Sequence, residues 1–464
     1  DRSSDTIYAL STAPSKSAIA IVRLSGPRTQ LTLRKMLPHP PRPRQAQLTR
    51  IHHPTDRTNT LDRGLCLFFP SPNSYTGEDM AELHVHGGTA VVGAILQALG
   101  SLPGMRLAEA GEFSRRAFDS GKMDLTEIEG VADLVNAQTE EQRRMAVRQA
   151  GGELHRMYDR WRTQLVGARA QMEAFIDFSE DENIEDGVVP QARAGVQVLG
   201  AAVRRHLDDR RRGELLRDGV ELCIVGPPNA GKSSLLNRLA LRQVAIVSEV
   251  AGTTRDIVEA TLDIGGFPVV IRDSAGLRET TGDAVEAEGI RRAVEAARRA
   301  DVRVVVLDAE QAMRARSIAD AVSHPAWLEL IAMPHTFVVL NKVDRPAVRG
   351  WAPPPGFSPG LRPALVSCVT MEGWDALMRG VAADIRGTWG SHSSAAASMP
   401  LTKARHREHL VRCMGHVDAF ERCEDVVLAA EELRHAADAL GRITGRVGIE
   451  DVLDALFTQF CIGK

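Results

Sequence analysis

Residues 226–233 read Gly-Pro-Pro-Asn-Ala-Gly-Lys-Ser, and they constrain the fold most because they match the phosphate-binding pattern G-x-x-x-x-G-K-[ST] at every fixed position. The run Val220–Val225 before them is apolar and has the length of a buried strand, and leucines with helical spacing follow. In such a loop, backbone N–H groups surround the β-phosphate, Lys232 reaches the β and γ oxygens, and the Ser233 hydroxyl binds Mg²⁺. The segment therefore predicts a nucleotide site rather than a glycine-rich turn that ends in a surface lysine.

Two motifs further along have the composition of GTPase switch segments. Thr253 and Thr254 can supply the hydroxyl that closes on Mg²⁺ when a γ-phosphate is present. Asp273 and Gly276 follow a strand-like run and can supply a carboxylate near Mg²⁺ and an N–H for the γ-phosphate. Both motifs stand in the order after the phosphate loop that a GTPase needs.

Residues 341–344, Asn-Lys-Val-Asp, end another strand-like run and predict which base is bound. The Asp344 carboxylate can accept two hydrogen bonds from guanine, from N1 and the 2-amino group, whereas adenine offers no such pair of donors. The main-chain groups of Ser367 and Cys368 then lie behind the base. Each short motif alone is weak, but together and in this order they predict GTP binding.

Leu277 stands where Ras-like switches carry the glutamine that orients the attacking water, and a leucine side chain cannot do this. Asn229 offers a side-chain oxygen near the α and β phosphates, where, with switch carbonyls, it can hold a monovalent cation in place of an arginine finger. This predicts hydrolysis that depends on potassium. Four carboxylates are candidates for positioning the water, although each is more typical of a solvated surface and spacing does not choose among them: Glu279, Asp283, Glu286 and Glu288.

The composition indicates a soluble globular protein of roughly three domains. The net charge of −3 excludes an overall positive field, so any nucleic-acid contact must be local. No apolar run approaches the roughly 20 residues that cross a bilayer. The six cysteines show no C-x-x-C spacing, which favours a reducing compartment.

Residues 6–55 contain eight Lys or Arg and no Asp or Glu. This composition resembles a transit peptide. However, residues 19–22 (Ile-Ala-Ile-Val) have a strand pattern, and the prolines of 38–43 interrupt any amphipathic helix. The stretch is therefore expected to belong to a folded domain.

Residues 1 to about 119 mix short strand-like runs with one helical pattern at 90–99, which is typical of a compact α+β domain. The strand-like runs cover 6–10, 18–24, 64–69 and 81–85. Beyond Leu125, apolar residues recur at three- and four-residue steps through 154–175 and predict a long amphipathic helix. Asp124 and Glu127 resemble a capping box before the helical region.

Strand and helix signals alternate from Val220 to about Ala383, which predicts a doubly wound parallel sheet. Helical periodicity returns from Lys403 to Phe460, so we expect one helical domain built from two segments with the nucleotide domain inserted in it. Further strand-like runs cover 269–272, 302–307, 336–340 and 364–367, and 346–363, rich in Pro and Gly, is expected to be a loop. The predicted domain boundaries are 1–119, 120–216, 217–383 and 384–464.

Two smaller features allow more than one interpretation. Cys461, near the chain end, can be a nucleophile in one-carbon chemistry or a small apolar residue in a fraying tail, and the residue type alone favours the tail. His84 and His86 can bind a metal at i, i+2 spacing, but two ligands are too few, so structural turns are expected there.

Taken together, these residues resemble the MnmE (TrmE) family of tRNA-modification GTPases over nearly the whole length of the chain. The marks are the GTPase motifs and the segments 75–79 (Tyr-Thr-Gly-Glu-Asp), 86–88 (His-Gly-Gly), 111–113 (Gly-Glu-Phe) and 461–464 (Cys-Ile-Gly-Lys). The resemblance implies a multidomain protein with an α+β N-terminal folate-binding domain that dimerises, an all-α helical domain in two segments, and an inserted α/β P-loop GTPase domain. It also implies a partner, an FAD protein of the MnmG (GidA) type. With this partner, C5 of the wobble uridine of certain tRNAs is modified with a one-carbon unit from 5,10-methylene- or 5-formyl-tetrahydrofolate.

The resemblance also implies individual roles. Glu286 becomes the catalytic residue that orients the hydrolytic water, and Cys461 becomes functional. By the same resemblance, Mg²⁺ is bound by Ser233 and Thr254, and K⁺ is bound by Asn229, Ser248, Val250 and Thr253. The nucleotide-binding residues are then Asn229, Ala230, Gly231, Lys232, Ser233, Ser234, Ser248, Thr253, Thr254, Asp273, Gly276, Asn341, Lys342, Asp344, Ser367 and Cys368.

The same resemblance implies that folate is contacted by Arg23, Glu82, Lys122 and Lys464. An anionic glutamyl tail suits Arg23 and the two lysines, and a carboxylate suits the N–H donors of a pterin.

The 346–363 insertion and residues 177–181 resemble mitochondrial members, in which the modification uses taurine. The expected location is therefore the mitochondrial matrix, with the bacterial cytoplasm as the alternative. The competing interpretation of function is a ribosome-assembly GTPase of the Era type, which acts by docking on RNA. Such proteins usually carry an RNA-binding module after the G domain, and the C-terminal helical segment offers only scattered basic residues.

Overall fold

The computed structural model describes residues 5–178, 187–209, 211–242, 260–272, 283–322, 324–355, 357, 362–390, 399–447 and 463. The chain forms two compact units, and each contains one six-stranded sheet. One unit comprises Asp1–Ala132, Arg148–Gln197 and Gly415–Lys464, and the other comprises Asp133–Val147 and Val198–Met414. Both units are therefore assembled from segments that are distant in the sequence.

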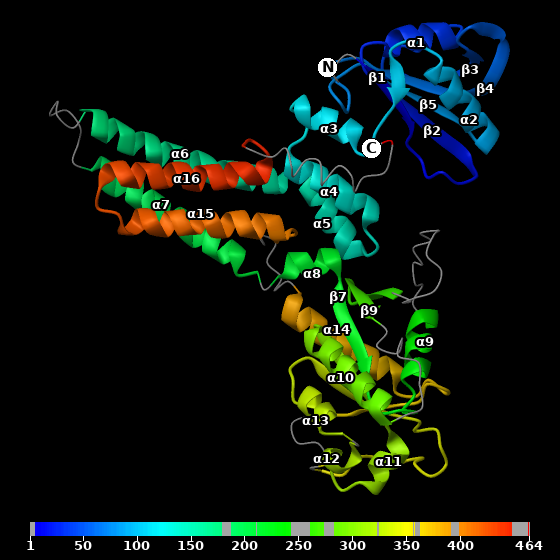
Figure 1. Cartoon of the computed structure of the whole chain (residues 1–464), viewed down its shortest axis with the longest axis vertical. Coiled ribbons are helices and arrows are strands. Elements are labelled where there is room, and N and C mark those ends of the chain that lie inside the picture. Colours follow the sequence, from blue (N-terminus) through cyan, green and yellow to red (C-terminus); the bar gives the residue numbers. More distant parts are fainter. Residues whose placement is uncertain are drawn as a thin grey trace. The chain divides into compact units, whose positions relative to one another are not determined.

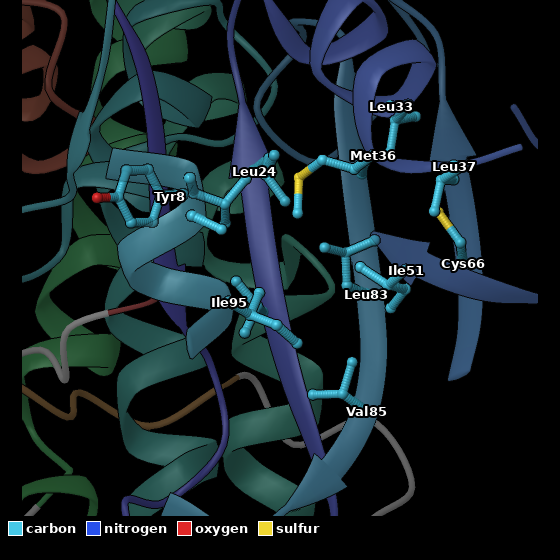
Figure 2. Packing of buried hydrophobic residues seen from close by; sticks show 14 of the residues in the cluster. Tyr8, Leu24, Leu33, Met36, Leu37, Ile51, Cys66, Leu83, Val85 and Ile95 are labelled. Atoms are coloured by element: carbon cyan, nitrogen blue, oxygen red, sulfur yellow. The ribbon is translucent and has the colours of Figure 1, made fainter. Parts of the chain in front are cut away.

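The first sheet has the strand order β3-β4-β5-β2-β1-β6, and only β1 and β6 pair in parallel. Val22 and Leu24 of β2 are buried on one face of this sheet. On that face they join a core cluster with Leu33 and Met36 of helix α1 and Ile95 of helix α2 (Figure 2). The elements are β1 (Thr6–Leu10), β2 (Ser17–Ser25), α1 (Thr29–Met36), β3 (Gln47–His53), β4 (Asp56–Phe69), β5 (Met80–Gly87), α2 (Thr89–Gly100), β6 (Met105–Leu107) and α3 (Glu112–Asp119).

The strands and the helix expected in this region are present. Residues 6–55, which contain no Asp or Glu, are folded into β1, β2, α1 and β3. The sequence patterns missed α1, α3, β3 and β6, which are short or carry many polar residues. The expectation of structural turns at His84 and His86 is wrong, because both lie on β5. Strand β5 continues to Gly87, because it pairs with β2 as far as Ser17.

Helix α6 (Glu153–Phe178) packs along α16 (Val426–Thr444), which comes from the other end of the chain (Figure 1). Most of the predicted apolar stripe is buried, with Leu154, Leu165 and Met172 all inaccessible to solvent. This contact joins the two helical segments that the sequence analysis assigned to one domain. The other helices of the region are α4 (Leu125–Asn136), α5 (Glu140–Ala150), α7 (Val188–Leu207) and α15 (Ala404–Arg422).

The capping box before α4 is confirmed. Asp124 Oδ1 accepts the backbone N–H of Glu127 at 2.9 Å, and Glu127 Oε2 accepts the backbone N–H of Asp124 at 2.8 Å. Two backbone donors at the start of the helix are thereby satisfied, even though aspartate replaces the usual serine or threonine.

The second sheet has the order β12-β11-β10-β7-β9-β8. All neighbours pair in parallel except β8 and β9, which are antiparallel. The predicted parallel sheet is present from β12 to β9, and the prediction is wrong only at the edge formed by β8. Gly265 and Gly266, with φ of 68° and 92°, form a tight turn between β8 and β9, and only glycine adopts such angles readily. The two strands therefore form a hairpin.

The strands of this sheet are β7 (Val220–Val225), β8 (Ala260–Ile264), β9 (Phe267–Arg272), β10 (Val302–Asp308), β11 (Thr336–Asn341) and β12 (Ala364–Val366). Its helices are α8 (Arg212–Asp218), α9 (Lys232–Arg242), α10 (Asp283–Arg299), α11 (Ala309–Arg314), α12 (Ile318–Ala321), α13 (Pro325–Ile331) and α14 (Trp374–Trp389). The described residues of 346–363 contain no helix or strand, as expected. Within the described chain, no helix combines the length and the apolarity needed to cross a membrane.

Candidate functional site

The phosphate-binding loop joins β7 to α9, as the sequence predicted. Gly226 and Gly231 have φ of 144° and 99°, which side chains rarely allow. A Cβ atom on Gly226 would lie 2.1 Å from the Val306 carbonyl oxygen, and one on Gly231 would lie 2.1 Å from Asn341 Nδ2. Because no side chain covers these positions, the backbone N–H groups of the loop and the start of α9 can approach a phosphate.

Two lysines close on this loop. Lys232 Nζ donates to the Pro227 carbonyl at 2.8 Å. Lys342 Nζ donates to the Asn229 carbonyl, and it forms an ion pair of 2.7 Å with Asp308 Oδ2 at the end of β10. Burial alone would raise the pKa of Asp308, but the hydrogen bonds from Lys342 and the backbone of Glu310 outweigh it and hold this pKa below its usual range. Sequence reasoning missed Asp308, although its position at the carboxyl end of a parallel strand was a signal.

Asn341 connects the phosphate loop to the segment that is predicted to bind the base. Its side chain is buried, its Nδ2 donates to the Ala230 carbonyl at 2.9 Å, and its Oδ1 accepts the backbone N–H of Cys368 at 3.3 Å. The sequence assigned Asn341 to the base motif, and the structure shows that it also acts as a brace between two loops.

The Asp344 carboxylate accepts a hydrogen bond from a buried serine. Ser367 Oγ is fully buried and donates to Asp344 Oδ1 at 2.6 Å. Arg238 of α9 donates from Nε to the Cys368 carbonyl at 2.9 Å and was not predicted from any motif. The structure thus brings the phosphate loop, Lys342, Asp344, Ser367 and Cys368 to the carboxyl edge of one sheet.

Several predicted residues lie outside the described part of the chain. The backbone of Glu286 lies on α10, but the described part of the chain does not include its side chain. The described part therefore does not include the predicted switch segments, most of the cation cage, or two residues of the chain end. The residues concerned are Ser248, Val250, Thr253, Thr254, Asp273, Gly276, Cys461 and Lys464. Ser233 and Ser234 lie in the first turn of α9.

A second cluster of predicted residues lies on the N-terminal sheet. Arg23 of β2 and Glu82 of β5 are register partners, and their side chains form an ion pair of 3.0 Å. The Arg23 guanidinium lies 5.6 Å from the centre of the Tyr75 ring and 5.7 Å from that of Phe113. His84 Nε2 lies 3.3 Å from Glu82 Oε2. This arrangement combines a cation, a carboxylate and two aromatic rings.

The chain end reaches this cluster. The Gly463 carbonyl accepts a hydrogen bond of 3.0 Å from Ser11 Oγ and one of 3.4 Å from the Arg23 guanidinium. Gly463 has φ of 103°, and a Cβ there would lie 2.3 Å from the Leu10 carbonyl oxygen, so only glycine fits. Arg23, Glu82 and the residue before Lys464 are thus brought together. Lys122 lies beside the 75–79 loop, with Cε 3.5 Å from where a Gly77 Cβ would stand, and no described contact joins it to Arg23.

A polar network holds the 75–79 loop. Arg116 donates to Glu78 at 2.9 Å and to Glu112 at 3.3 Å, and Ser25 Oγ lies 2.7 Å from both Thr76 Oγ1 and Glu78 Oε2. Burial would raise the pKa of Glu112, but hydrogen bonds, first of all from Arg106, hold this pKa below its usual range. Sequence reasoning noted Glu112 as a motif residue and missed Arg116.

The described residues contain no group of three or more His, Cys, Asp or Glu side chains placed to hold a metal ion. Both histidines of β5 have carboxylate partners, since His86 Nδ1 lies 2.9 Å from Asp62 Oδ1 and His84 pairs with Glu82. Burial raises the pKa of the Cys66 and Cys413 thiols to about 12, so neither is a thiolate at neutral pH.

Two protein-family models match the chain. One is described as the MnmE helical domain and covers residues 125–461, and the other as the GTP-binding protein TrmE N-terminus and covers residues 6–122. A tRNA modification GTPase MnmE of Parvibaculum lavamentivorans is 49% identical, with 99% of this chain and 100% of the relative covered. The mitochondrial 5-taurinomethyluridine-[tRNA] synthase subunit GTPB3 of Rattus norvegicus is 46% identical, with 99% and 93% covered. Among solved structures, the G domain of the T. maritima FeoB iron transporter is 20% identical with a TM-score of 0.25, and the match covers 36% of this chain and 98% of that one.

Proposed function

The chain belongs to the MnmE (TrmE) family of tRNA modification GTPases and is itself a GTPase, and we propose that its GTP hydrolysis drives modification at C5 of the wobble uridine of certain tRNAs. The membership of the family supports the tRNA part of this proposal, and the structural observation that carries the GTP part is the Asn341 brace, which ties the phosphate loop at Ala230 to the predicted base-binding segment at Cys368. The groups that would bind the phosphates and those that would bind the base are thereby held at a set spacing, as a nucleoside triphosphate requires.

The residues around the loop fit GTP and Mg²⁺. The two glycines leave the loop backbone open to phosphate oxygens, and Lys232 and Lys342 supply positive charge beside them. Asp344, oriented by Ser367, would accept the N1 and 2-amino protons of guanine. Mg²⁺ would be held by Ser233 and Thr254, and it would neutralise charge that develops on the phosphates.

Hydrolysis in this proposal depends on K⁺ and on Glu286. Asn229 has φ of 58°, which turns this residue out of the usual helical or extended backbone within the loop. Together with Ser248, Val250 and Thr253 it would hold K⁺, and Glu286 would orient the attacking water. The ion would supply the positive charge that an arginine finger supplies elsewhere.

The N-terminal cluster would bind a tetrahydrofolate, as 5,10-methylene- or 5-formyl-tetrahydrofolate. Glu82 would accept the N–H donors of the pterin, and Arg23, Lys122 and Lys464 would bind the anionic glutamyl tail. The donor set fits such a ligand, because a guanidinium, a carboxylate and two aromatic rings lie within one cluster. The folate would supply the one-carbon unit, and Cys461 would lie in the adjoining chain end.

The wider proposal includes domains and partners. The domains would be 1–119, 120–216, 217–383 and 384–464, with the protein a homodimer through the first. An FAD protein of the MnmG (GidA) type would complete the tRNA-modifying enzyme. Both bacterial and mitochondrial relatives are similar to this chain, and we propose the mitochondrial matrix, with a taurinomethyl product, over the bacterial cytoplasm.

The test is reconstitution. The purified protein, an MnmG-type partner, GTP, K⁺ and 5,10-methylene-tetrahydrofolate are incubated with a tRNA transcript and the amine donor, and nucleosides are analysed by mass spectrometry. We expect a C5-modified wobble uridine that requires both GTP and folate. A product that forms equally without GTP, or unmodified tRNA with every component present, would contradict the proposal.

A further inference from the structure

We propose that an exposed basic surface on α1, on the loop at 37–46 and at the start of β4 binds the phosphate backbone of the tRNA. This inference rests on the proposed function, because it concerns where the substrate docks. The surface is defined by four residues, Arg34, Lys35, Arg42 and Arg57, and the side chains of all four are exposed.

Hydrogen bonds hold the segments that carry these residues together. Arg57 donates to the Arg34 carbonyl at 2.9 Å, which joins the start of β4 to the last turn of α1. Gln47 Nε2 donates to the His39 carbonyl at 3.4 Å, and the backbone N–H of Arg44 donates to the Phe68 carbonyl at 2.8 Å. The loop at 37–46 is thereby fastened to β3 and β4, beside α1. The positive charges therefore belong to one ordered part of the sheet.

The four side chains make no ion pair with any residue in the part of the chain that the structure describes. Residues 6–55 supply no carboxylate. The nearest one in sequence, Asp56, accepts hydrogen bonds from the Thr58 backbone N–H at 2.9 Å and from Thr58 Oγ1 at 2.6 Å. These contacts, first of all the side-chain hydrogen bond from Thr58, lower the pKa of Asp56.

Some exposed arginines elsewhere have acidic partners. Arg144 pairs with Glu140 at 2.9 Å, Arg299 with Glu295 at 2.5 Å, and Arg314 with Glu310 at 2.6 Å. The basic surface, in contrast, gathers four cations without an ion pair to any described residue, in a chain whose net charge is −3.

The pairing of β3 with β4 also places two like charges opposite each other. Arg50 of β3 and Arg63 of β4 are register partners, and both are exposed. Like charges directly opposite each other destabilise a strand pair. An anion bound outside the sheet removes this cost.

A polyanion with regularly spaced phosphates fits such a surface better than a small anion does. Arginine and lysine both donate N–H groups to phosphate oxygens, and each phosphate contact releases condensed counterions from the nucleic acid. These contacts fix the position of the RNA without reading its sequence. Selection of the wobble uridine is then left to other surfaces.

The test compares three variants of the full chain by fluorescence anisotropy with a labelled tRNA transcript over a range of KCl concentrations. The first is Arg34→Gln/Lys35→Gln/Arg42→Gln, which spares Arg57 because that residue also caps α1. The matched control, Arg144→Gln/Arg299→Gln/Arg314→Gln, removes as many charges from paired positions. The third, Arg34→Lys/Arg42→Lys, keeps the charge. Thermal unfolding confirms that each variant is folded.

We expect the first variant to lose about 10- to 100-fold in tRNA affinity near 0.1 M KCl, with the slope of log K against log[salt] lower by about two. The control and the lysine variant should stay within about 3-fold of wild type. Wild-type affinity and slope in the first variant would overturn the proposal. Binding to vesicles of phosphatidylcholine and phosphatidylserine is measured in parallel. If the first variant loses affinity for the vesicles but not for tRNA, the proposal is also overturned, because the basic surface would then bind a membrane. If wild type modifies tRNA while the first variant binds tRNA normally, only the proposal of the basic surface is refuted. If wild type leaves tRNA unmodified, the proposed function itself is refuted.

Discussion

The amide of Asn341 and the carbonyl of Ala230 are joined by a hydrogen bond of 2.9 Å across the carboxyl edge of the second sheet. Asn341 ends β11, and Ala230 lies in the phosphate loop, so the bond joins residues that are far apart in the sequence. It sets the distance between the groups that would bind the phosphates and those that would bind the base.

Replacing Asn341 with alanine should weaken GTP and GDP alike. The change leaves the Ala230 carbonyl and the Cys368 N–H without their partner, and such a loss costs about 1–3 kcal/mol in a buried site. We expect about 5- to 100-fold weaker binding of both nucleotides by calorimetry. Asn59→Ala, at an exposed position on β4, is the control and should bind as wild type does. A selective loss of GTP would mean that Asn341 acts on the γ-phosphate instead.

Asp344→Asn should change which base is bound. The asparagine amide can donate to the 2-oxo group of xanthine, whereas it no longer accepts both protons of guanine. We expect GTP to bind about 100-fold more weakly and xanthosine triphosphate to bind more tightly than it does to wild type. Competition against a fluorescent nucleotide measures both. An equal loss for both nucleotides would show that the Ser367 contact, rather than base recognition, is the main role of Asp344.

Asn229→Ala should remove the dependence of GTP hydrolysis on potassium. Wild type is expected to hydrolyse GTP at least about 10-fold faster in KCl than in NaCl, because K⁺ stabilises charge in the transition state. Asn229 has φ of 58°, so alanine also introduces backbone strain. Asn229→Gly also lacks the side-chain oxygen, but glycine adopts this φ without strain. This variant should likewise lose the dependence of GTP hydrolysis on potassium. Equal wild-type rates in both salts would contradict the cation argument.

Glu286→Ala should keep GTP affinity while turnover falls by about 100-fold or more, because a group that orients water acts mainly in the transition state. Glu288→Ala changes a rival candidate on the same helix and should keep wild-type turnover. Single-turnover hydrolysis and equilibrium binding separate the two effects. Weaker binding with unchanged turnover would assign Glu286 a structural role.

Glu112→Gln should flatten the acid dependence of stability in the N-terminal domain. The contacts with Arg106 and Arg116 lower the pKa of Glu112 in the folded state. Their stabilising effect is therefore present above the unfolded pKa of about 4.5 and is lost as the pH falls through the folded value. We expect the variant to be less stable by about 1–3 kcal/mol at pH 7, with the difference narrowing toward pH 3. Urea unfolding at several pH values measures this, and a constant difference would exclude the ionised carboxylate as the cause.

Long or strongly patterned elements could be predicted from the sequence. Strand β7, the phosphate loop and the stripe of α6 all follow from local apolar spacing, and the Asp124 capping box follows from two residues three apart. The hairpin of β8 and β9 was missed, although two glycines between apolar runs indicate such a turn. Helices α1 and α3 were missed because short helices carry too few periodic positions to stand out.

What the sequence determined by itself was the phosphate loop between β7 and α9 and the position of the Asn-Lys-Val-Asp motif at the end of β11, because each motif is contiguous and depends on the backbone of a few neighbouring residues. Only the tertiary structure decided which distant residues meet: Asn341 with Ala230, Asp308 with Lys342, and Gly463 with Ser11 and Arg23. Such contacts arise because parallel strands bring their carboxyl ends to one edge and because a chain end packs where its backbone groups find partners. A strand end can be recognised in the sequence, but the partner that its residues meet leaves no local pattern in the chain.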